Sequence, residues 1–424
     1  MTALDELQPV YRPLERCAMC ASGALELRVP LAPIPIATPN FSVPAGLRDR
    51  PEFRIGVPLD LYQCAQCGHV QVGVIGNPDY QYRDYVYTTS VSLGLAEHFA
   101  SYARETLDRL AVPPGSLVVE IGSNDGTLLR NFKAAGMRVV GVDPAKRIAE
   151  AATASGIETV AEFWNAATAR AVRERFGRAS LIIANNVIAN VPNLLDFGEG
   201  IADALAPQGA FVFETQYGAD VVERRLVDTI YHEHISYFLT DPTKRWLEEI
   251  GLEMLDVSPV ATKGGSMRVT AQRRGGGRAA NPSVDEWIAR ERASEMFGDS
   301  FFAQLSTAIA KIGSELQALV ERSGEAAGFG VSVGTTTMLA QFGLYDKIAF
   351  LVDDDPNKER ALTGPGYAID VLPPAALLER RPPATVVFAW RYADAIASKH
   401  RAYLDAGGRF VVPLPSVREV PRAG

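Results

Sequence analysis

The chain has 424 residues, which is too long for one ordinary hydrophobic core and predicts two to four domains. Its formal net charge of −8 argues against a nucleic-acid or anionic-membrane surface as the main partner. No apolar run approaches the length of a membrane span, and residues 1–7 lack the basic and apolar regions of a secretion signal. We therefore predict a cytoplasmic protein with neither nucleic acid nor membrane as a partner.

The four cysteines form two Cys-x-x-Cys pairs near the N-terminus, and none is left over. In a reducing compartment this spacing predicts a structural zinc site, because four thiolates leave no coordination position open. The alternative is four reduced or disulfide-bonded cysteines. A Pro-rich stretch at 30–58 predicts strands and turns, in a domain small enough to need such a metal. The predicted zinc ligands are Cys17, Cys20, Cys64 and Cys67.

Tyrosines stand at alternate or near-alternate positions in residues 77–92. The alternation predicts an extended segment with Tyr85 and Tyr87 on one face, where tyrosines more often pack than react. A helix is predicted at 93–110, and a Pro-rich linker at 112–115 leads into the next unit.

A buried strand at 117–121 leads into a glycine turn and a helix, and a second strand ends at Asp143. This is the first βαβ unit of a doubly wound fold, whose ligand lies at the carboxyl ends of the strands. The dinucleotide pattern G-x-G-x-x-G is absent. Glu120 followed by Gly122 and Gly126 instead favours S-adenosylmethionine over a nicotinamide cofactor, with Asp143 placed for the ribose hydroxyls. The predicted donor-binding residues are Glu120, Gly122, Asn124, Gly126, Asp143, Pro144, Asn185 and Asn186.

The Rossmann-like pattern then continues with alternating helices and strands. Helices are predicted at 145–155, 163–176, 194–205 and 241–250. Strands are predicted at 157–160, 179–186, 209–214, 253–257 and 266–272. The strand at 179–186 ends at Asn185 and Asn186, where the donor or the substrate would lie.

The densest group of proton-handling side chains, at 228–238, follows the fifth strand of this pattern. Two of the five histidines stand there around Glu233, directly after Tyr231. A histidine is a ready base near neutral pH, a carboxylate can orient it, and a tyrosine can donate to a developing oxyanion. The alternative is that these polar residues only begin a helix. Catalysis is favoured because the stretch enters from the edge of the sheet that binds the donor. The His-Glu-x-x-His pattern of a zinc protease is absent.

A flexible basic linker at 272–278 precedes a long helical region at 282–323, whose apolar stripe predicts core or interdomain packing. The last hundred residues predict another α/β unit. Its strands are predicted near 326–330, 347–354, 385–390 and 409–414. A glycine turn and an acidic strand end echo the donor-binding unit and indicate an internal duplication. This copy either grips the substrate or is purely structural.

Several motifs follow one another along the chain in a characteristic order. They are the paired cysteines, Glu-Ile-Gly-Ser-Asn-Asp-Gly at 120–126, Tyr-His-Glu-His-Ile-Ser-Tyr-Phe at 231–238, Gly-Gly-Ser-Met-Arg at 264–268, Val-Asp-Asp-Asp-Pro-Asn-Lys at 352–358 and Phe-Ala-Trp-Arg-Tyr at 388–392. Together they resemble the nucleotide-deoxysugar C-methyltransferases, which branch C3 of dTDP-4-keto-deoxyhexoses on the way to natural-product sugars such as mycarose. The resemblance covers nearly the whole chain.

The resemblance implies an α/β protein of three domains. A Rossmann-like class I methyltransferase domain is flanked by a small zinc-binding domain and by a Rossmann-like domain that helps to hold the sugar nucleotide. The predicted boundaries are 1–75, 76–272 and 273–424. The implied partner is a dTDP-sugar, and a monomer is favoured. The implied catalytic residues are Tyr231, Glu233, His234 and either Tyr85 or Tyr87.

Two positions depart from the family pattern. Where the family commonly has a histidine, this chain has Asn190, which can donate a hydrogen bond but cannot share in proton transfer. The usual Lys-Gly-Asn of the C-terminal glycine turn reads Gly-Thr-Thr at 334–336, which weakens any assignment of phosphate or sugar contacts there.

The residues fit a C-methylation in which a 4-keto group acidifies the hydrogen at C3. We predict that His234 removes this proton with Glu233 orienting the ring, and that Tyr231 with Tyr85 or Tyr87 donates to the enolate oxygen. The enolate then attacks the sulfonium methyl in line. Three rival functions are an O- or N-methyltransferase of a sugar nucleotide, a ketoreductase or additional reductase activity with NADPH, and a non-enzymatic zinc-ribbon binding module.

Overall fold

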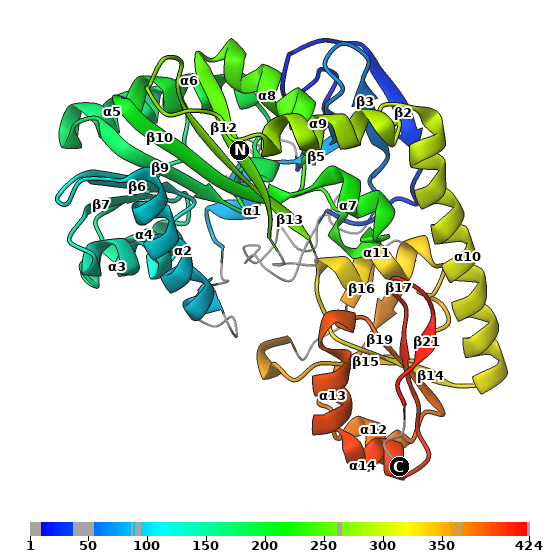
Figure 1. The fold of residues 1–424 in the computed structure, drawn as a ribbon. Helices are drawn as coiled ribbons and strands as arrows, with labels where there is room; N and C mark the ends of the chain where they lie inside the picture. Colours follow the sequence, from blue (N-terminus) through cyan, green and yellow to red (C-terminus); the bar gives the residue numbers. More distant parts are fainter. Residues whose placement is uncertain are drawn as a thin grey trace, which may run out of the picture.

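The computed structural model describes residues 10–36, 55–85, 88–89, 95–260, 265–358, 362–364 and 366–421. Three larger sheets lie in separate lobes, and a long helix, α10 (Asp299–Ser323), runs along one side of the molecule between the first and the last lobe (Figure 1). No helix in the described part of the chain is both long enough and apolar enough to cross a membrane.

The central sheet has seven strands in the order β12-β13-β10-β9-β6-β7-β8. Strands β6 to β10 are parallel, whereas β13 is antiparallel to both of its neighbours. The strands are β6 (Leu117–Ile121), β7 (Arg138–Val142), β8 (Thr159–Val160), β9 (Ala179–Asn185), β10 (Leu205–Gln216), β12 (Leu252–Val260) and β13 (Ser266–Arg273). This mostly parallel, doubly wound sheet confirms the predicted Rossmann-like fold of the central unit.

Helices cover both faces of the central sheet because alternate residues of each buried strand point to opposite sides. In β9, Leu181 and Ile183 pack with Phe132 on one face, whereas Ile182 packs on the other face in the cluster that contains Trp246. The helices around this sheet are α2 (Leu95–Leu110), α3 (Thr127–Ala134), α4 (Lys146–Ala154), α5 (Ala166–Phe176), α6 (Leu194–Ala204) and α8 (Thr240–Glu249).

The N-terminal lobe contains a four-stranded antiparallel sheet in the order β11-β4-β3-β2 and a two-stranded sheet of β1 and β5. Its strands are β1 (Tyr11–Pro13), β2 (Leu25–Val29), β3 (Leu61–Cys64), β4 (Val70–Val72) and β5 (Val74–Gly76). The remaining strand, β11 (Ser236–Tyr237), comes from the acid-base stretch far along the chain. The lobe is therefore completed by residues outside its own segment.

One predicted element is wrong, and one is divided. The extended segment expected from 77 onward begins with the helix α1 (Pro78–Tyr82), because the Asn77 side chain accepts from the amide of Asp79 at 3.0 Å and proline occupies the first turn. The helical region at 282–323 forms two helices, α9 (Ser283–Ala293) and α10, with Glu295 at a φ of 50° between them.

The C-terminal lobe is a six-stranded sheet in the order β18-β15-β14-β19-β20-β21, parallel except for β21. Its strands are β14 (Ala326–Phe329), β15 (Phe350–Val352), β18 (Val371–Leu372), β19 (Ala384–Val387), β20 (Phe410–Val412) and β21 (Arg418–Glu419). Its helices are α11 (Val333–Gln341), α12 (Ala376–Arg380), α13 (Ala393–Lys399) and α14 (Arg401–Asp405). A hairpin of β16 (Leu362–Gly364) and β17 (Tyr367–Ile369) lies beside this sheet.

The lobes contact one another through buried side chains and hydrogen bonds. The apolar stripe of α10 is buried, with Leu305 and Leu316 both at 0% exposure. Gln341 of α11 exchanges two hydrogen bonds with the backbone of Ala32, at 2.9 and 2.8 Å. The lobes are therefore packed against one another rather than linked by chain alone.

Candidate active site

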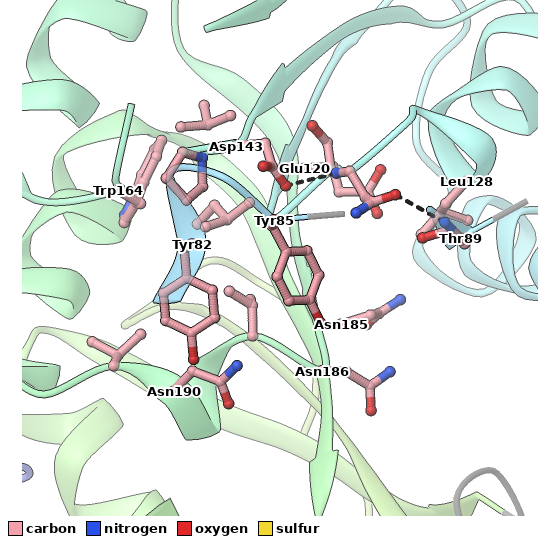
Figure 2. Close-up of a pocket in the computed structure, with 18 of the residues that line it drawn as sticks. Tyr82, Tyr85, Thr89, Glu120, Leu128, Asp143, Trp164, Asn185, Asn186 and Asn190 are labelled. Atoms are coloured by element: carbon pink, nitrogen blue, oxygen red, sulfur yellow. Dashed lines mark hydrogen bonds between the residues drawn. The ribbon is translucent and has the colours of Figure 1, made fainter. Parts of the chain in front are cut away.

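A cavity of about 500 Å³ opens at the carboxyl ends of β6, β7, β9 and β10 (Figure 2). Strand succession reverses there between β6 and β9, and doubly wound sheets bind ligands at such a switch point. Seven of the eight predicted donor-binding residues line the cavity. They are Glu120, Gly122, Asn124, Asp143, Pro144, Asn185 and Asn186. Gly126 is not in the lining; it precedes α3 with a φ of 75° and so shapes the turn.

Backbone amides hold the glycine turn against the end of β7. The amide of Asn124 donates to Asp143 Oδ2 at 2.8 Å, and the amide of Ala145 donates to Oδ1 at 2.9 Å. The amide of Thr89 donates to the side chain of Asn124 at 2.9 Å. These bonds fix the Asp143 carboxylate at the cavity wall, where its remaining lone pairs can still accept from a ligand hydroxyl.

Five residues that line the cavity have a buried polar atom without a hydrogen-bond partner among the described residues, and three of these atoms are Glu120 Oε2, Ser123 Oγ and Asn185 Nδ2. Each unsatisfied buried atom costs about 1–3 kcal/mol, so such atoms usually have a ligand or water. Burial raises the pKa of Glu120 well above its ordinary value, and the charges of Asp143 and Asp125 raise it further. A cationic ligand with hydrogen-bond donors would relieve both penalties.

Carboxylates dominate the charged lining of the cavity. Glu120, Asp143, Glu162 and Glu214 line it, whereas its described lining includes no lysine or arginine. This charge attracts a cation such as a sulfonium and repels the anionic pyrophosphate of a nicotinamide cofactor. The electrostatics therefore agree with the glycine spacing of the sequence.

An ion-pair network at the end of β10 was missed by the sequence analysis. Glu214 is 1% exposed, and Arg268 donates to its Oε1 from Nε at 2.7 Å and from Nη2 at 2.6 Å. His98, in α2, lines the cavity with Nε2 at 3.3 Å from Glu214 Oε2. Arg268 also lies over the ring of Tyr102, at 4.3 Å from its centroid. A single histidine in a predicted helix gives no sign of such partners.

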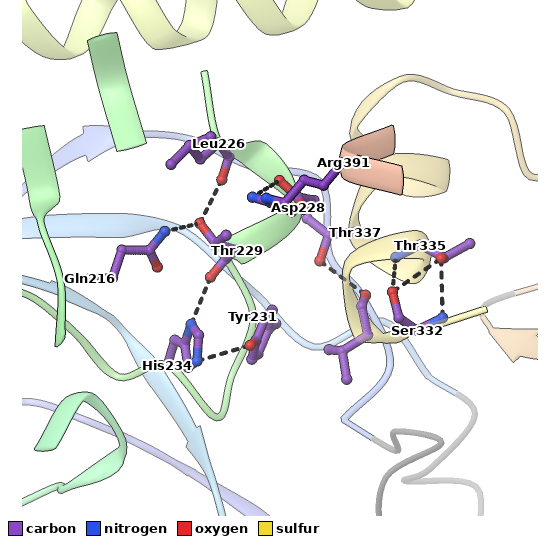
Figure 3. Close-up of polar contacts among 11 residues, drawn as sticks. Gln216, Leu226, Asp228, Thr229, Tyr231, His234, Ser332, Thr335, Thr337 and Arg391 are labelled. Atoms are coloured by element: carbon purple, nitrogen blue, oxygen red, sulfur yellow. Dashed lines mark hydrogen bonds and ion pairs between the residues drawn. The ribbon is translucent and has the colours of Figure 1, made fainter. Parts of the chain in front are cut away.

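The predicted acid-base stretch forms a hydrogen-bonded chain after η4 (Val227–Thr229) (Figure 3). His234 Nε2 lies 2.8 Å from the Tyr231 hydroxyl oxygen, and Nδ1 lies 3.0 Å from the carbonyl oxygen of Thr229. A carbonyl only accepts, so Nδ1 carries the proton, and Tyr231 donates to the lone pair of Nε2. The Thr229 carbonyl therefore helps to orient the ring, and the orienting role of Glu233 stays a prediction.

Tyr82 joins this group from α1, a residue that the sequence analysis did not select. Burial raises the pKa values of Tyr82 and Tyr231 well above the ordinary range, and the nearby charge of Glu233 raises both further, as the Tyr85 phenol does when it is ionised. These four side chains therefore lie close together. Tyr82 and Tyr85 also line the cavity, which places the acid-base stretch directly beyond that wall. Tyr87 lies outside the described residues.

Asn190 ends η3 (Ile188–Asn190), the short turn after β9, and lines the cavity beside Tyr82 (Figure 2). The Tyr82 hydroxyl and Asn190 Oδ1 are both buried without a hydrogen-bond partner among the described residues. The lining does not include Tyr231, Glu233 or His234. Among the predicted catalytic residues, Asn190 therefore lines the cavity from the turn that follows β9.

The N-terminal sheet holds the acid-base stretch in place. Strand β11, which follows the stretch directly, pairs with β4 of that sheet. His232 lies 1% exposed with Nε2 at 3.0 Å from the carbonyl oxygen of Pro58, and the amide of Val72 donates to Ile235 at 2.9 Å. The stretch therefore depends on the N-terminal lobe for its conformation.

The four cysteines form one cluster in this lobe, with all their Sγ atoms within 4.8 Å of one another. The Sγ atoms of Cys17 and Cys67 are 3.6 Å apart, as are those of Cys20 and Cys64. Both distances are too long for a disulfide, so that alternative is wrong. Thiolates about 2.3 Å from a tetrahedral zinc ion would be about 3.8 Å apart, which the cluster matches closely.

The C-terminal lobe reaches the site from the other side. Arg391 forms an ion pair with both carboxylate oxygens of Asp228, and Thr337 of α11 donates to the carbonyl oxygen of Ile230 at 2.8 Å (Figure 3). Tyr392 lines the cavity although it is 64% exposed. The C-terminal lobe therefore contributes to the lining of the cavity.

Two family models match the chain, a methyltransferase domain at residues 95–257 and a C-methyltransferase C-terminal domain at residues 261–415. C-methyltransferase NovU of Streptomyces niveus is 29% identical over 419 residues, which span 98% of this chain and 99% of that protein. The two models meet close to the end of β12.

Solved methyltransferase structures resemble part of the chain. A magnesium protoporphyrin IX methyltransferase from Synechocystis PCC 6803 is 13% identical, covers 43% of this chain and 80% of its own, and has a TM-score of 0.32. An S-adenosylmethionine-dependent methyltransferase from Clostridium acetobutylicum is 10% identical over 42% of this chain and 92% of its own, with a TM-score of 0.34.

Proposed function

Since the chain is an S-adenosylmethionine-dependent C-methyltransferase, we propose that it methylates C3 of a dTDP-4-keto-deoxyhexose, on the way to a branched natural-product sugar. The hydrogen bond from Tyr231 to His234 Nε2, beside an acid-lined cavity, carries this proposal. A carbon nucleophile must be generated by removing a proton, and a neighbouring ketone makes that proton acidic. An O- or N-methyltransferase has less need of a buried proton acceptor, because its nucleophile already has a lone pair.

The cavity suits the methyl donor. When bound, S-adenosylmethionine supplies an electrophilic methyl group on a positively charged sulfur. In our proposal Asp143 accepts from the ribose hydroxyls, and Glu120 and Asn185 use their unsatisfied atoms on the amino-acid end. His98, held by the buried Glu214, faces the donor carboxylate. The acidic lining adds attraction for the net positive donor.

His234 is the final proton acceptor in this proposal. Because its Nε2 lone pair faces the Tyr231 hydroxyl, the phenolic proton moves to Nε2 as the Tyr231 oxygen takes the proton from C3. The raised pKa of Tyr231 disfavours a free phenolate, so the two transfers are concerted. Glu233 offsets the imidazolium charge, and Tyr85 donates to the enolate oxygen that forms.

We further propose that the cysteine cluster binds a structural Zn²⁺. The four Sγ atoms satisfy the distances of a closed tetrahedral site, which leaves no position for catalysis. The ion would stabilise the turn that leads through Gly68 into β4. Because β4 pairs with β11, the metal would act on catalysis only through the position of the acid-base stretch.

The acceptor's diphosphate is placed outside the donor cavity in this proposal, since four carboxylates would repel it there. The side that remains is the C-terminal lobe, near Tyr392 and Arg391. A dTDP-sugar as the sole partner, and a monomeric state, remain predictions from the sequence.

The same lobe offers little support for the rival NADPH-dependent reductase. A nicotinamide cofactor would place its pyrophosphate at the N-terminus of α11, after the glycine turn. There the backbone of Asp228 packs so closely on Gly334 that an added Cβ would lie 2.5 Å from its carbonyl oxygen. Thr337 donates to Ile230 of the same segment. Polypeptide therefore occupies the place that a phosphate would need.

Incubation with candidate dTDP-4-keto sugars and donor carrying a carbon-13 methyl tests the function. We expect a product heavier by one methyl group, in which the labelled carbon couples to a ring carbon. Coupling only through oxygen or nitrogen would identify the rival methyltransferases. Oxidation of NADPH by the keto sugar would identify the reductase.

The proton acceptor is tested without methyl transfer. With S-adenosylhomocysteine bound, the wild type should exchange the hydrogen next to the ketone for deuterium from solvent. His234→Asn should slow this exchange about 10²–10⁴-fold, the usual contribution of a general base, with unchanged affinity for S-adenosylhomocysteine. Undiminished exchange in His234→Asn would contradict the role of this residue.

A further inference from the structure

The wall between the donor cavity and the acid-base stretch contains two unsatisfied polar atoms side by side. The Tyr82 hydroxyl comes from the end of α1 and Asn190 Oδ1 from the end of η3 (Figure 2). Both atoms are buried, and neither has a hydrogen-bond partner among the described residues. The Asn190 amide lies close enough to the Tyr82 oxygen to lower the pKa of Tyr82 by hydrogen bonding, while the buried Tyr82 hydroxyl and Asn190 Oδ1 have no acceptor or donor of their own among the described residues.

The two atoms have fixed and opposite hydrogen-bonding character. Burial, with the charge of Glu233, raises the pKa of Tyr82 well above its ordinary value, so the phenol keeps its proton and can donate. Asn190 Oδ1 can only accept, and an amide does not change its protonation state near neutral pH. The pair therefore offers one donor and one acceptor to the same space at every working pH.

A hydroxyl group is the substituent that satisfies both atoms, since it accepts from the phenol and donates to the amide oxygen. A ketone would leave Asn190 Oδ1 unsatisfied, and a hydrogen or a methyl group would leave both atoms unsatisfied. We propose that Tyr82 and Asn190 form a subsite that recognises a hydroxyl group of the methyl acceptor. This inference rests on the proposed function for the identity of the acceptor.

The position of the pair indicates which hydroxyl it recognises. The charge of Glu233 acts on both Tyr82 and Tyr231, so the subsite adjoins the groups that take the proton. The hydroxyl is therefore on the carbon that is deprotonated or on its neighbour. In a 4-keto-2,6-dideoxyhexose the ring hydroxyl next to the ketone is at C3, the carbon that receives the methyl group.

The surroundings keep Tyr82 in this orientation without a ligand. Its ring lies 6.0 Å from that of Tyr85 and packs edge-on against Phe163 at 6.5 Å. Arg83 covers the other ring, with its guanidinium carbon 4.8 Å from the centroid of Phe163. A preorganised donor loses little entropy on binding, which is how a specificity subsite gains selectivity.

Calorimetric titration of the protein loaded with S-adenosylhomocysteine tests the subsite, because no methyl transfer can follow. The ligands are a dTDP-4-keto-2,6-dideoxyhexose with its C3 hydroxyl and the matching 3-deoxy sugar. We expect the wild type to bind the hydroxylated ligand about 10-fold or more tightly, as for one or two net hydrogen bonds. Tyr82→Phe and Asn190→Leu should each reduce this preference to about threefold or less.

Tyr80→Phe is the matched control. It also removes a phenolic hydroxyl from α1, but at a residue outside the cavity lining. It should retain the wild-type preference, and all three variants should unfold cooperatively on heating as the wild type does, which shows that they are folded. Equal binding of the two ligands by the wild type, or a full preference in Tyr82→Phe, would overturn the subsite alone. Failure of the wild type to bind either sugar nucleotide would overturn the proposed function and this inference with it.

Discussion

Single side chains in this protein act through their burial as much as through their chemistry. The position of the proton on His234 follows from the partners of its two ring nitrogens. The Thr229 carbonyl only accepts, so it determines that Nδ1 carries the proton. Glu120 and Asn185 were expected at the donor site from their positions at strand ends. Their unsatisfied buried atoms add an independent reason to place a ligand there.

His232 gives a prediction about stability against pH. Burial lowers its pKa from 6.5 to about 4 in the folded protein, so the folded state resists a proton that the unfolded state accepts. Folding stability should therefore be unaffected above about pH 6.5, fall as the pH drops from about 6.5 to about 4, and level off below that. At pH 5 the loss from this residue is about 2 kcal/mol.

The measurement is urea unfolding of the wild type and His232→Gln at neutral pH and at about pH 5. Glutamine keeps a donor for the Pro58 carbonyl but does not titrate. The variant should lose about 2 kcal/mol less than the wild type over this interval. Equal losses in both proteins would show that His232 is not held neutral. Other titrating groups, including the cysteines, are common to both proteins and cancel.

At the scale of elements, the pairing of β4 with β11 links the cysteine cluster to the acid-base stretch. The cysteine cluster is joined to the cavity side as well, because the amide of Leu194 at the start of α6 donates to the carbonyl oxygen of Ala18 at 2.9 Å. The N-terminal lobe thus supports both the stretch at 231–234 and the chain that follows Asn190. Its function is to position residues that belong to the central unit.

Removal of zinc should therefore abolish catalysis before it abolishes donor binding. A strong chelator, or Cys67→Ser, should lower methyl transfer by about 10²-fold or more, because the base and its tyrosine lose their fixed geometry. Affinity for S-adenosylhomocysteine should change less than about threefold, since the donor residues lie on β6, β7 and β9. Added Zn²⁺ should restore the chelated wild type but not the variant. A metal-free wild type with full activity would contradict this dependence.

At the scale of the whole molecule, the three lobes pack against one another, and a nearly buried ion pair attaches the C-terminal lobe to the central unit. Asp228 lies three residues before Tyr231, is 9% exposed and pairs with Arg391. Removing one partner of such a pair leaves an uncompensated charge, which is far more costly than losing a surface ion pair.

Arg391→Gln should therefore loosen the C-terminal lobe against the acid-base stretch. We expect KM for the acceptor to rise about 10-fold or more, with unchanged affinity for S-adenosylhomocysteine, because the donor cavity is formed mainly by the central sheet. Arg401→Gln serves as the control, since its ion pair with Asp405 lies within one exposed helix and should contribute little. Equal KM values for the wild type and Arg391→Gln would show that the ion pair does not position the lobe.

The sequence by itself determined the elements whose signals are local. Buried strands with glycine turns, the acidic strand end at Asp143 and the spacing of the cysteine pairs each follow from nearby residues, and the structure contains all three. Hydrophobic periodicity likewise sufficed to predict the doubly wound fold of the central unit, because a parallel strand buried on both faces leaves a continuous apolar run. The domain boundaries at 75 and 272 remain predictions.

Tertiary structure alone decided which distant residues act together. No local pattern indicates that Tyr82 faces Asn190, that His98 reaches Glu214, or that β11 completes the N-terminal sheet, because these partners are separated by about a hundred residues or more. The helix at Pro78–Tyr82 was mistaken for an extended segment because alternating tyrosines outweighed the Asn-Pro cap. Side-chain partners depend on how the lobes pack, and packing is a property of the whole chain rather than of any stretch within it.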